Sequence, residues 1–165
     1  EICFVADNNY ERFLRERAPE IVSGIEEGDF IYHGEKVGRH RGIPFYTIGQ
    51  RRGLNLAFGK PVYVKNIDVM NNIIELGDKE EILGSSVIAN DLNYVSVEKI
   101  GIGATVFAKI RYSDKPAEAI VIEERNDYIK IQFIEKKNAI TPGQSLVIYD
   151  ERGYVLCGAI IQKED

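Results

Sequence analysis

The sequence has few of the residues that crosslink small extracellular domains or bind metals. It contains two cysteines, Cys3 and Cys157, near opposite ends of its 165 residues, and two histidines. A small secreted domain held by disulfides would have more cysteines, and these four side chains lack the ligand spacing of a structural zinc site. No apolar run is long enough to cross a bilayer, and no stretch has the pattern of a signal peptide. We therefore expect a cytoplasmic protein with no membrane partner and no bound metal.

Acidic residues are missing from one part of the chain only. The whole chain has 26 acidic and 21 basic residues and a net charge of -5, yet no Asp or Glu occurs between Lys36 and Lys65. The basic residues of this segment are Lys36, Arg39, Arg41, Arg51, Arg52, Lys60 and Lys65. Because charges of both signs are usually interspersed on a protein surface, this segment predicts a positive patch that binds a polyanion.

The same segment carries side chains suited to RNA. Arg51 and Arg52 can form bidentate contacts with phosphates, Gln50 supplies an amide, and Tyr46 supplies a stacking face. Two plainer interpretations remain open: a β-hairpin whose glycines serve backbone geometry only, or a contact surface for another domain. The candidate contacts, to the RNA backbone or to another domain, are Arg39, His40, Arg41, Gln50, Arg51 and Arg52.

The spacing of apolar residues predicts one clear helix followed by many short strands. The helix spans residues 7–18, with Asn8 as its N-cap, Glu11 completing a capping box, and Pro19 ending it. Strands are predicted at 29–33, 61–68, 73–76, 86–90, 94–97, 105–111, 117–123, 128–133, 145–149 and 155–162. Short strands at even spacing favour a small closed barrel, and the charged run 78–81 indicates a domain boundary between Gly77 and Ser86.

The two cysteines have different expected roles. Cys3 lies in an apolar run, where a lone cysteine is usually a small buried hydrophobic residue. It also lies just before a predicted helix, and a helix N-terminus favours the thiolate that a nucleophile or a sulfur carrier needs. Both interpretations stay open for Cys3. Cys157 lies within the last predicted strand and is expected to be a core residue.

Two motifs in the strand-rich part are ambiguous by themselves. Arg111 and Tyr112 end a predicted strand, where they are either an exposed edge pair or a pair that stacks on and clamps a nucleotide. The run from Thr141 through Pro142 and Gly143 to Gln144 is typical of a turn.

These motifs follow one another in an order that identifies a family. The stretches are 2–14 with Cys3, 38–54 with Tyr-Thr-Ile-Gly-Gln-Arg-Arg-Gly, 108–112 and 139–149. Together they resemble the C-terminal half of the bacterial tRNA-specific 2-thiouridylases over nearly the whole chain. The resemblance and the strand pattern imply a mainly β fold with one or two short helices (α+β). Residues 1–18 would end an upstream catalytic domain, 19–82 form a small mixed central domain, and 83–165 form a closed antiparallel β-barrel resembling domain 2 of translation elongation factors.

The resemblance also implies an activity. Members of the family place sulfur on C2 of the wobble uridine of tRNAs such as those for Lys, Glu and Gln. Their N-terminal domain uses ATP with Mg to adenylate the uridine, and a cysteine persulfide, loaded by a cysteine desulfurase or a relay protein, delivers the sulfur. The persulfide cysteine matches Cys3, and the family's tRNA contacts match Arg111, Tyr112 and Gln144. The ATP-binding loop has no match here, so we expect this piece to bind no cofactor and to be inactive alone.

A second hypothesis from another class is a non-catalytic RNA-binding or translation-factor-like β-barrel module. In that case Cys3 is inert, so the two hypotheses differ in whether function requires its thiol.

Overall fold

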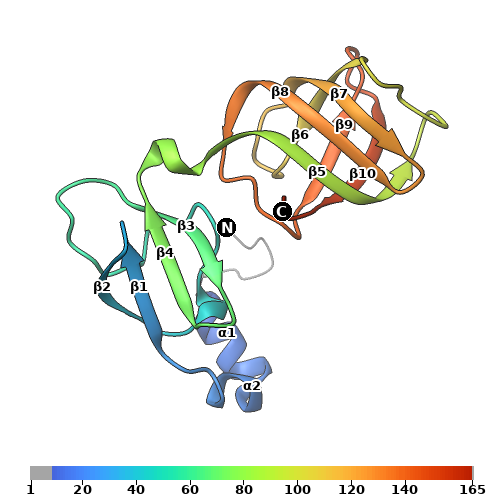
Figure 1. Ribbon diagram of the computed structural model, residues 1–165. Helices are drawn as coiled ribbons and strands as arrows, with labels where there is room; N and C mark the ends of the chain where they lie inside the picture. Colours follow the sequence, from blue (N-terminus) through green and yellow to red (C-terminus); the bar gives the residue numbers. More distant parts are fainter. Residues whose placement is uncertain (1–8, 165) are drawn as a thin grey trace. The chain divides into compact units, whose positions relative to one another are not determined.

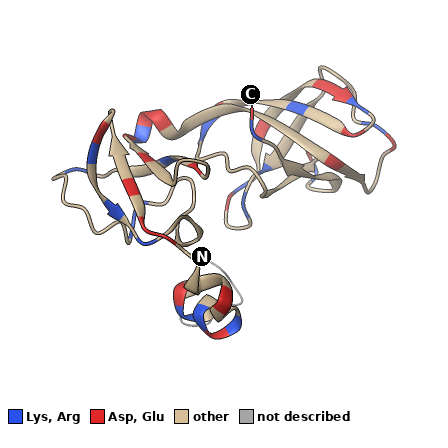
Figure 2. Ribbon diagram, turned by 60° about the horizontal axis from the view of Figure 1, so that its bottom comes forward, with Lys and Arg blue, Asp and Glu red and all other residues tan. Residues whose placement is uncertain are grey.

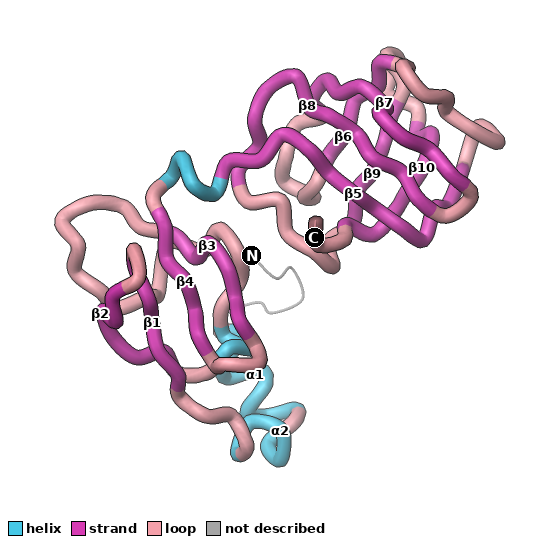
Figure 3. The backbone as a smooth tube through the Cα atoms, in the orientation of Figure 1, coloured by secondary structure: helices cyan, strands magenta, loops and turns pink. Residues whose placement is uncertain are grey.

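The structure is a computed structural model that describes residues 9–164 (Figure 1). The chain divides into two compact units, of which the first ends at Glu81 and the second begins at Ile82. Strands dominate both units (Figure 3). This confirms the predicted fold class, a mainly β protein with two short α-helices in the described part of the chain.

The first helix begins one residue later than its predicted cap. α1 (Tyr10–Arg17) is capped by Asn9, whose Oδ1 accepts a hydrogen bond of 2.9 Å from the backbone N–H of Arg12. The predicted capping box of Asn8 and Glu11 is therefore wrong, because the residue three positions after the actual cap is Arg12 and not an acidic residue.

Pro19 begins a second helix. α1 ends at Arg17, and α2 (Pro19–Ser23) has Pro19 at its first position, where the missing N–H leaves no hydrogen bond unmade. None of the helices among residues 9–164 is long and apolar enough to span a membrane.

A four-stranded sheet follows the helices. Its strands are β1 (Gly28–Tyr32), β2 (Glu35–His40), β3 (Tyr63–Asp68) and β4 (Ile73–Gly77), in the order β2-β1-β4-β3. β1 pairs with β2 and β3 with β4 in antiparallel hairpins, whereas β1 and β4 run parallel. The sheet therefore contains both parallel and antiparallel pairs.

The cationic segment between β2 and β3 is a packed loop and not a hairpin. Residues 41–62 contain one short 3-10 helix, η1 (Ile43–Phe45), and otherwise run as irregular chain (Figure 3). Tyr46 and Leu54 are buried in the core of the unit, where the Tyr46 ring meets the Phe30 ring edge-on at 5.3 Å between centroids. Burial of these two side chains fixes the loop against the sheet.

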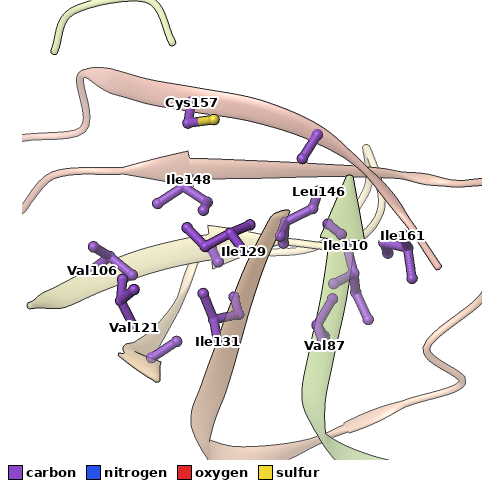
Figure 4. Packing of buried hydrophobic residues seen from close by; sticks show 14 of the residues in the cluster. Val87, Val106, Ile110, Val121, Ile129, Ile131, Leu146, Ile148, Cys157 and Ile161 are labelled. Atoms are coloured by element: carbon purple, nitrogen blue, oxygen red, sulfur yellow. The ribbon is translucent and has the colours of Figure 1, made fainter. Parts of the chain in front are cut away.

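The second unit is a closed six-stranded barrel. Its strands are β5 (Leu83–Tyr94), β6 (Thr105–Lys109), β7 (Ala117–Arg125), β8 (Tyr128–Asn138), β9 (Ser145–Tyr149) and β10 (Val155–Ile161), paired antiparallel in the closed order β10-β5-β8-β7-β6-β9. Apolar side chains from all six strands fill the interior (Figure 4). Cys157 is 0% exposed among them, which confirms the prediction of a core cysteine.

One predicted break between two strands of the barrel is a β-bulge within a single strand. The sequence predicted separate strands at 86–90 and 94–97, but β5 is continuous from Leu83 to Tyr94. Asn93 of β5 pairs with Gly158 of β10, and Asn90 pairs with Ile160, so β5 has one more residue than β10 between these two pairs. Asp91 lies in this stretch and has a φ of 55°. The turn-like residues at this position therefore mark a β-bulge within one strand, since an Asp tolerates the left-handed region.

Candidate nucleic-acid interface

Two of the predicted motifs come together at one end of the barrel. Arg111 lies in the loop between β6 and β7, and Thr141 lies in the loop between β8 and β9. The Arg111 guanidinium donates from Nη2 to the Ala139 carbonyl at 2.8 Å and to Thr141 Oγ1 at 3.4 Å. Arg111 therefore holds the two loops together, which an exposed edge arginine would not do.

The loop between β8 and β9 contains the predicted turn. The backbone N–H of Gln144 donates to the Thr141 carbonyl at 3.3 Å, with Pro142 second and Gly143 third at a φ of 84°, as in a type II turn. Gln144 Oε1 is buried and accepts no hydrogen bond from the described residues. A buried acceptor normally has a donor, so Gln144 Oε1 is an unsatisfied acceptor at this end of the barrel.

Tyr112 stands out from the same end of the barrel. Its side chain is 99% exposed. Lys109 donates from Nζ to the Tyr112 carbonyl at 2.8 Å, and the ammonium also lies 5.6 Å from the centroid of the Tyr112 ring. With a cation over one face, the other face of the ring is open to a stacking partner.

The positive patch predicted for residues 36–65 is largely neutralised. Five of its seven basic side chains form ion pairs with acidic residues from outside the segment, and basic and acidic positions are interspersed over this unit (Figure 2). The pairs are Lys36–Asp29 at 2.7 Å, Arg39–Glu27 at 3.6 Å, Arg41–Glu11, Lys60–Asp78 at 2.9 Å and Lys65–Glu81 at 2.8 Å. The prediction of one concentrated patch is wrong because the fold supplies the counter-charges that the local sequence lacks.

Arg51 and Arg52 are the exceptions. Both are exposed, and neither has an acidic partner among residues 9–164. They lie in a loop whose backbone is tied to β3, because Gly49 N–H donates to the Val64 carbonyl at 2.7 Å and Val64 N–H donates to the Gln50 carbonyl at 2.9 Å.

His40 and Gln50 use their polar groups inside the unit. His40 is 1% exposed; its Nδ1 accepts from Gly42 N–H at 3.1 Å and its Nε2 donates to the Asn72 carbonyl at 3.1 Å. Gln50 Oε1 accepts from Thr47 N–H at 3.0 Å, and Gln50 Nε2 donates to the Arg52 carbonyl at 2.9 Å. The prediction of His40 as a surface contact is wrong, and the Gln50 amide shapes the loop that carries the two free arginines.

Comparison with known proteins identifies the family of this chain. A model described as a tRNA methyl transferase PRC-barrel domain matches residues 11–78, and one described as an aminomethyltransferase beta-barrel domain matches residues 84–161. The tRNA-specific 2-thiouridylase MnmA 1 of Clostridium botulinum (strain Loch Maree / Type A3) is 43% identical over 164 residues, 99% of this chain and 45% of the relative. The tRNA-specific 2-thiouridylase MnmA of Clostridioides difficile (strain 630) is 45% identical over 164 residues, 99% and 44%.

The chain belongs to the tRNA-specific 2-thiouridylase family. It matches the C-terminal part of these proteins and spans somewhat less than half the length of the relatives. The resemblance inferred from the motifs is thereby confirmed.

In this member of the 2-thiouridylase family, the structure describes the predicted tRNA contacts but not the predicted sulfur carrier. Arg111 and Tyr112 from the loop between β6 and β7 share one end of the barrel with Gln144 from the loop between β8 and β9. Cys3 lies outside the described residues. The sequence did not predict a role for Lys109, which binds the Tyr112 carbonyl, or for Thr141, which binds the Arg111 side chain. The sequence signal for both residues is their position next to the predicted contacts.

One group of side chains in the first unit has the composition of a metal site. Ligand atoms of His33, Asp78 and Glu81 lie within 4.8 Å of one another. Lys60 binds Asp78 and Lys65 binds Glu81, and the hydrogen bond from Lys65 is the largest of the effects that lower the pKa of Glu81 to about 2. Because two ammonium groups already balance the two carboxylates, a metal cation would have to displace them.

The burial of His40 makes the first unit of this chain sensitive to pH. Burial lowers the pKa of His40 from its ordinary value of 6.5 and outweighs the bond to Asn72, which raises it. Below pH 6.5 the unfolded chain therefore binds a proton that folded His40 resists. We expect the unfolding free energy to fall with decreasing pH by up to about 1.4 kcal/mol per pH unit.

Hydrogen exchange of the β1 amides at about pH 7.5 and about pH 5.5 measures this dependence. A His33→Gln variant is the matched control, because His33 is the only other histidine of the chain and is exposed. Equal stability of this variant at both pH values would contradict the role assigned to His40.

Proposed function

We propose that this chain is the tRNA-binding and sulfur-carrying part of a tRNA 2-thiouridylase. The observation that carries the proposal is the meeting of Arg111, Tyr112 and Gln144 at one end of the barrel. These are the residues that match the family's tRNA contacts, and the relatives are named for action on tRNA. Their convergence from separate loops supports a single binding surface.

The three side chains have distinct roles in this proposal. The open face of the Tyr112 ring stacks on an unpaired base, with the Lys109 ammonium over the opposite face. Gln144 Oε1 accepts a hydrogen bond from a base or a ribose hydroxyl. Arg111 fixes the spacing of the two loops, and its remaining N–H groups face a phosphate.

Sulfur transfer in this proposal depends on Cys3. ATP, bound by an N-terminal domain, supplies the energy by turning the uridine C2 oxygen into a leaving group. The terminal sulfur of a Cys3 persulfide then attacks C2, and AMP departs with the oxygen. A second thiolate attacks the sulfur of Cys3, so that the S–S bond breaks, the delivered sulfur remains on C2 and a disulfide forms on the protein.

Replacing Tyr112 tests the binding surface directly. We expect Tyr112→Ala in the complete protein to weaken tRNA binding by about 1–3 kcal/mol, the usual value of one base–aromatic stack. Tyr112→Phe should bind as the wild type does, because it keeps the ring. The salt dependence should not change, since the ring is uncharged. Titrations of tRNA at several salt concentrations give both quantities.

Tyr154→Ala is the matched control, because Tyr154 is also an exposed tyrosine, at 66%, in the turn between β9 and β10 at the other end of the barrel. Equal losses of affinity for Tyr112→Ala and Tyr154→Ala would contradict a specific stacking role, and wild-type protein that fails to bind tRNA would refute the proposed function.

A further inference from the structure

The first unit keeps two cations free and holds them on a fixed loop. Five of the seven basic residues between Lys36 and Lys65 are paired within the unit, and only Arg51 and Arg52 have no acidic partner among residues 9–164. Both guanidinium groups are exposed. An arginine whose donors are unused and solvated is available to a phosphate, which it binds with two parallel hydrogen bonds.

The loop that carries them, residues 47–53, is shaped before any ligand arrives. The Gln50 amide spans it, accepting from Thr47 N–H at 3.0 Å and donating to the Arg52 carbonyl at 2.9 Å. The backbone at Gly49 and Gln50 forms two hydrogen bonds with Val64 of β3. Beyond the loop, Leu54 is 5% exposed and anchors the chain in the core. Since the backbone is already ordered, binding loses less conformational entropy than it would on a flexible loop.

We propose that loop 47–53 is a preformed binding site for phosphodiester groups of the tRNA backbone. Arg51 and Arg52 bind the phosphates, and Gln50 is a positioning residue that acts through the Arg52 carbonyl. The identity of the RNA as tRNA rests on the proposed function above. The site is distinct from the end of the barrel, because it lies in the other unit of the chain.

The charge distribution favours RNA over a protein surface as the partner. The whole chain has a net charge of -5, and its other cations in this segment are neutralised by the ion pairs. Two adjacent arginines without an acidic neighbour form a local positive site, and successive phosphates of a nucleic acid are the polyanion that such a site attracts. A contact with another domain of the same protein is the alternative that the test must separate.

The salt dependence of tRNA binding tests the proposal. In the complete protein, Arg51→Gln/Arg52→Gln should reduce the magnitude of the slope of log affinity against log salt by about 1.4–1.8, because each lost phosphate contact removes ~0.7–0.9. The control Lys36→Gln/Arg39→Gln removes the same formal charge from side chains that are paired with Asp29 and Glu27. Its slope should stay close to that of the wild type.

Gln50→Ala separates positioning from charge. This variant keeps both arginines but removes the amide bridge, so we expect a several-fold loss of tRNA affinity with the slope retained. Addition of inorganic phosphate at millimolar concentration should not displace the tRNA, which distinguishes a backbone site from a site for the free anion.

The outcomes also separate this inference from the proposed function. If Tyr112→Ala weakens tRNA binding while Arg51→Gln/Arg52→Gln leaves the slope unchanged, the phosphate site is refuted and the proposed function stands. An unchanged slope together with a lower melting temperature of the complete protein would identify the loop as a domain contact. Equal slope losses in the arginine variant and in the Lys36/Arg39 control would refute the distinction between free and paired cations.

Discussion

Replacing Cys3 by serine in the complete protein is expected to abolish wobble 2-thiouridine in tRNA. Serine has nearly the same shape as cysteine, but its oxygen cannot carry a persulfide, so the transferable sulfur would have no carrier. The measurement is mass spectrometry of bulk tRNA from a host that lacks its own enzyme and expresses the variant. A complete loss is the largest functional effect that we expect from any single substitution in this chain.

The matched control is Cys157→Ala. The Cys157 thiol is fully buried in the barrel, and burial is the largest effect that raises its pKa, so it is poorly suited to act as a thiolate. Alanine is a better choice than serine at this position, because a hydroxyl costs more free energy to bury than a methyl group. We expect normal 2-thiouridine with this control. Retention of 2-thiouridine with Cys3→Ser as well would support a non-catalytic RNA-binding module in place of a sulfur carrier.

The largest expected effect on stability comes from Glu124 in β7. This carboxylate is 6% exposed and accepts hydrogen bonds from Tyr94 Oη at 2.6 Å, Ile100 N–H at 2.9 Å and Gly101 N–H at 2.7 Å. It thereby holds the segment after β5 against the barrel. Glu124→Ala would leave these donors without their acceptor, and we expect it to lower the unfolding free energy by about 3 kcal/mol.

Urea denaturation of this chain, followed by far-ultraviolet circular dichroism, measures the loss. Glu123→Ala is the matched control: its carboxylate belongs to the preceding residue of β7, is partly exposed and forms an ion pair with Arg125 at 3.2 Å. An exposed ion pair contributes little, so the control should change stability by less than about 1 kcal/mol. Similar losses in both variants would argue against the role assigned to Glu124.

The same carboxylate predicts a dependence on acid. Burial raises the pKa of Glu124, but the hydrogen bonds from Tyr94, Ile100 and Gly101 together lower it below the ordinary 4.5. Its contribution to stability is therefore complete above pH 4.5 and is lost as the pH falls further, because the unfolded state takes up the proton first. Glu124→Gln should lose this part of the acid dependence.

Much of the fold could be predicted from local sequence. Alternating apolar residues located β3, β4 and the strands of the barrel, because a strand with one buried face has a period of two. The helix cap was misplaced by one residue, since Asn8 and Asn9 are both good caps and only the backbone geometry selects Asn9. The bulge at Asp91 was misread as a break, because a turn-forming residue looks the same in a loop and within a continuous strand.

The sequence by itself determined the family and predicted the β-barrel, and the resemblance to that family predicts Arg111, Tyr112 and Gln144 as a candidate surface. These depend on short motifs and on periodicity, which are properties of neighbouring residues. Only the tertiary structure decided which charged groups are free. Acidic residues from α1, from β1 and the residue before it, and from the chain after β4 neutralise five cations of the basic segment, and burial withdraws His40 from the surface. Electrostatic interaction depends on distance in space, so a run of charge in the sequence becomes a binding site only where the fold brings no counter-charge to it.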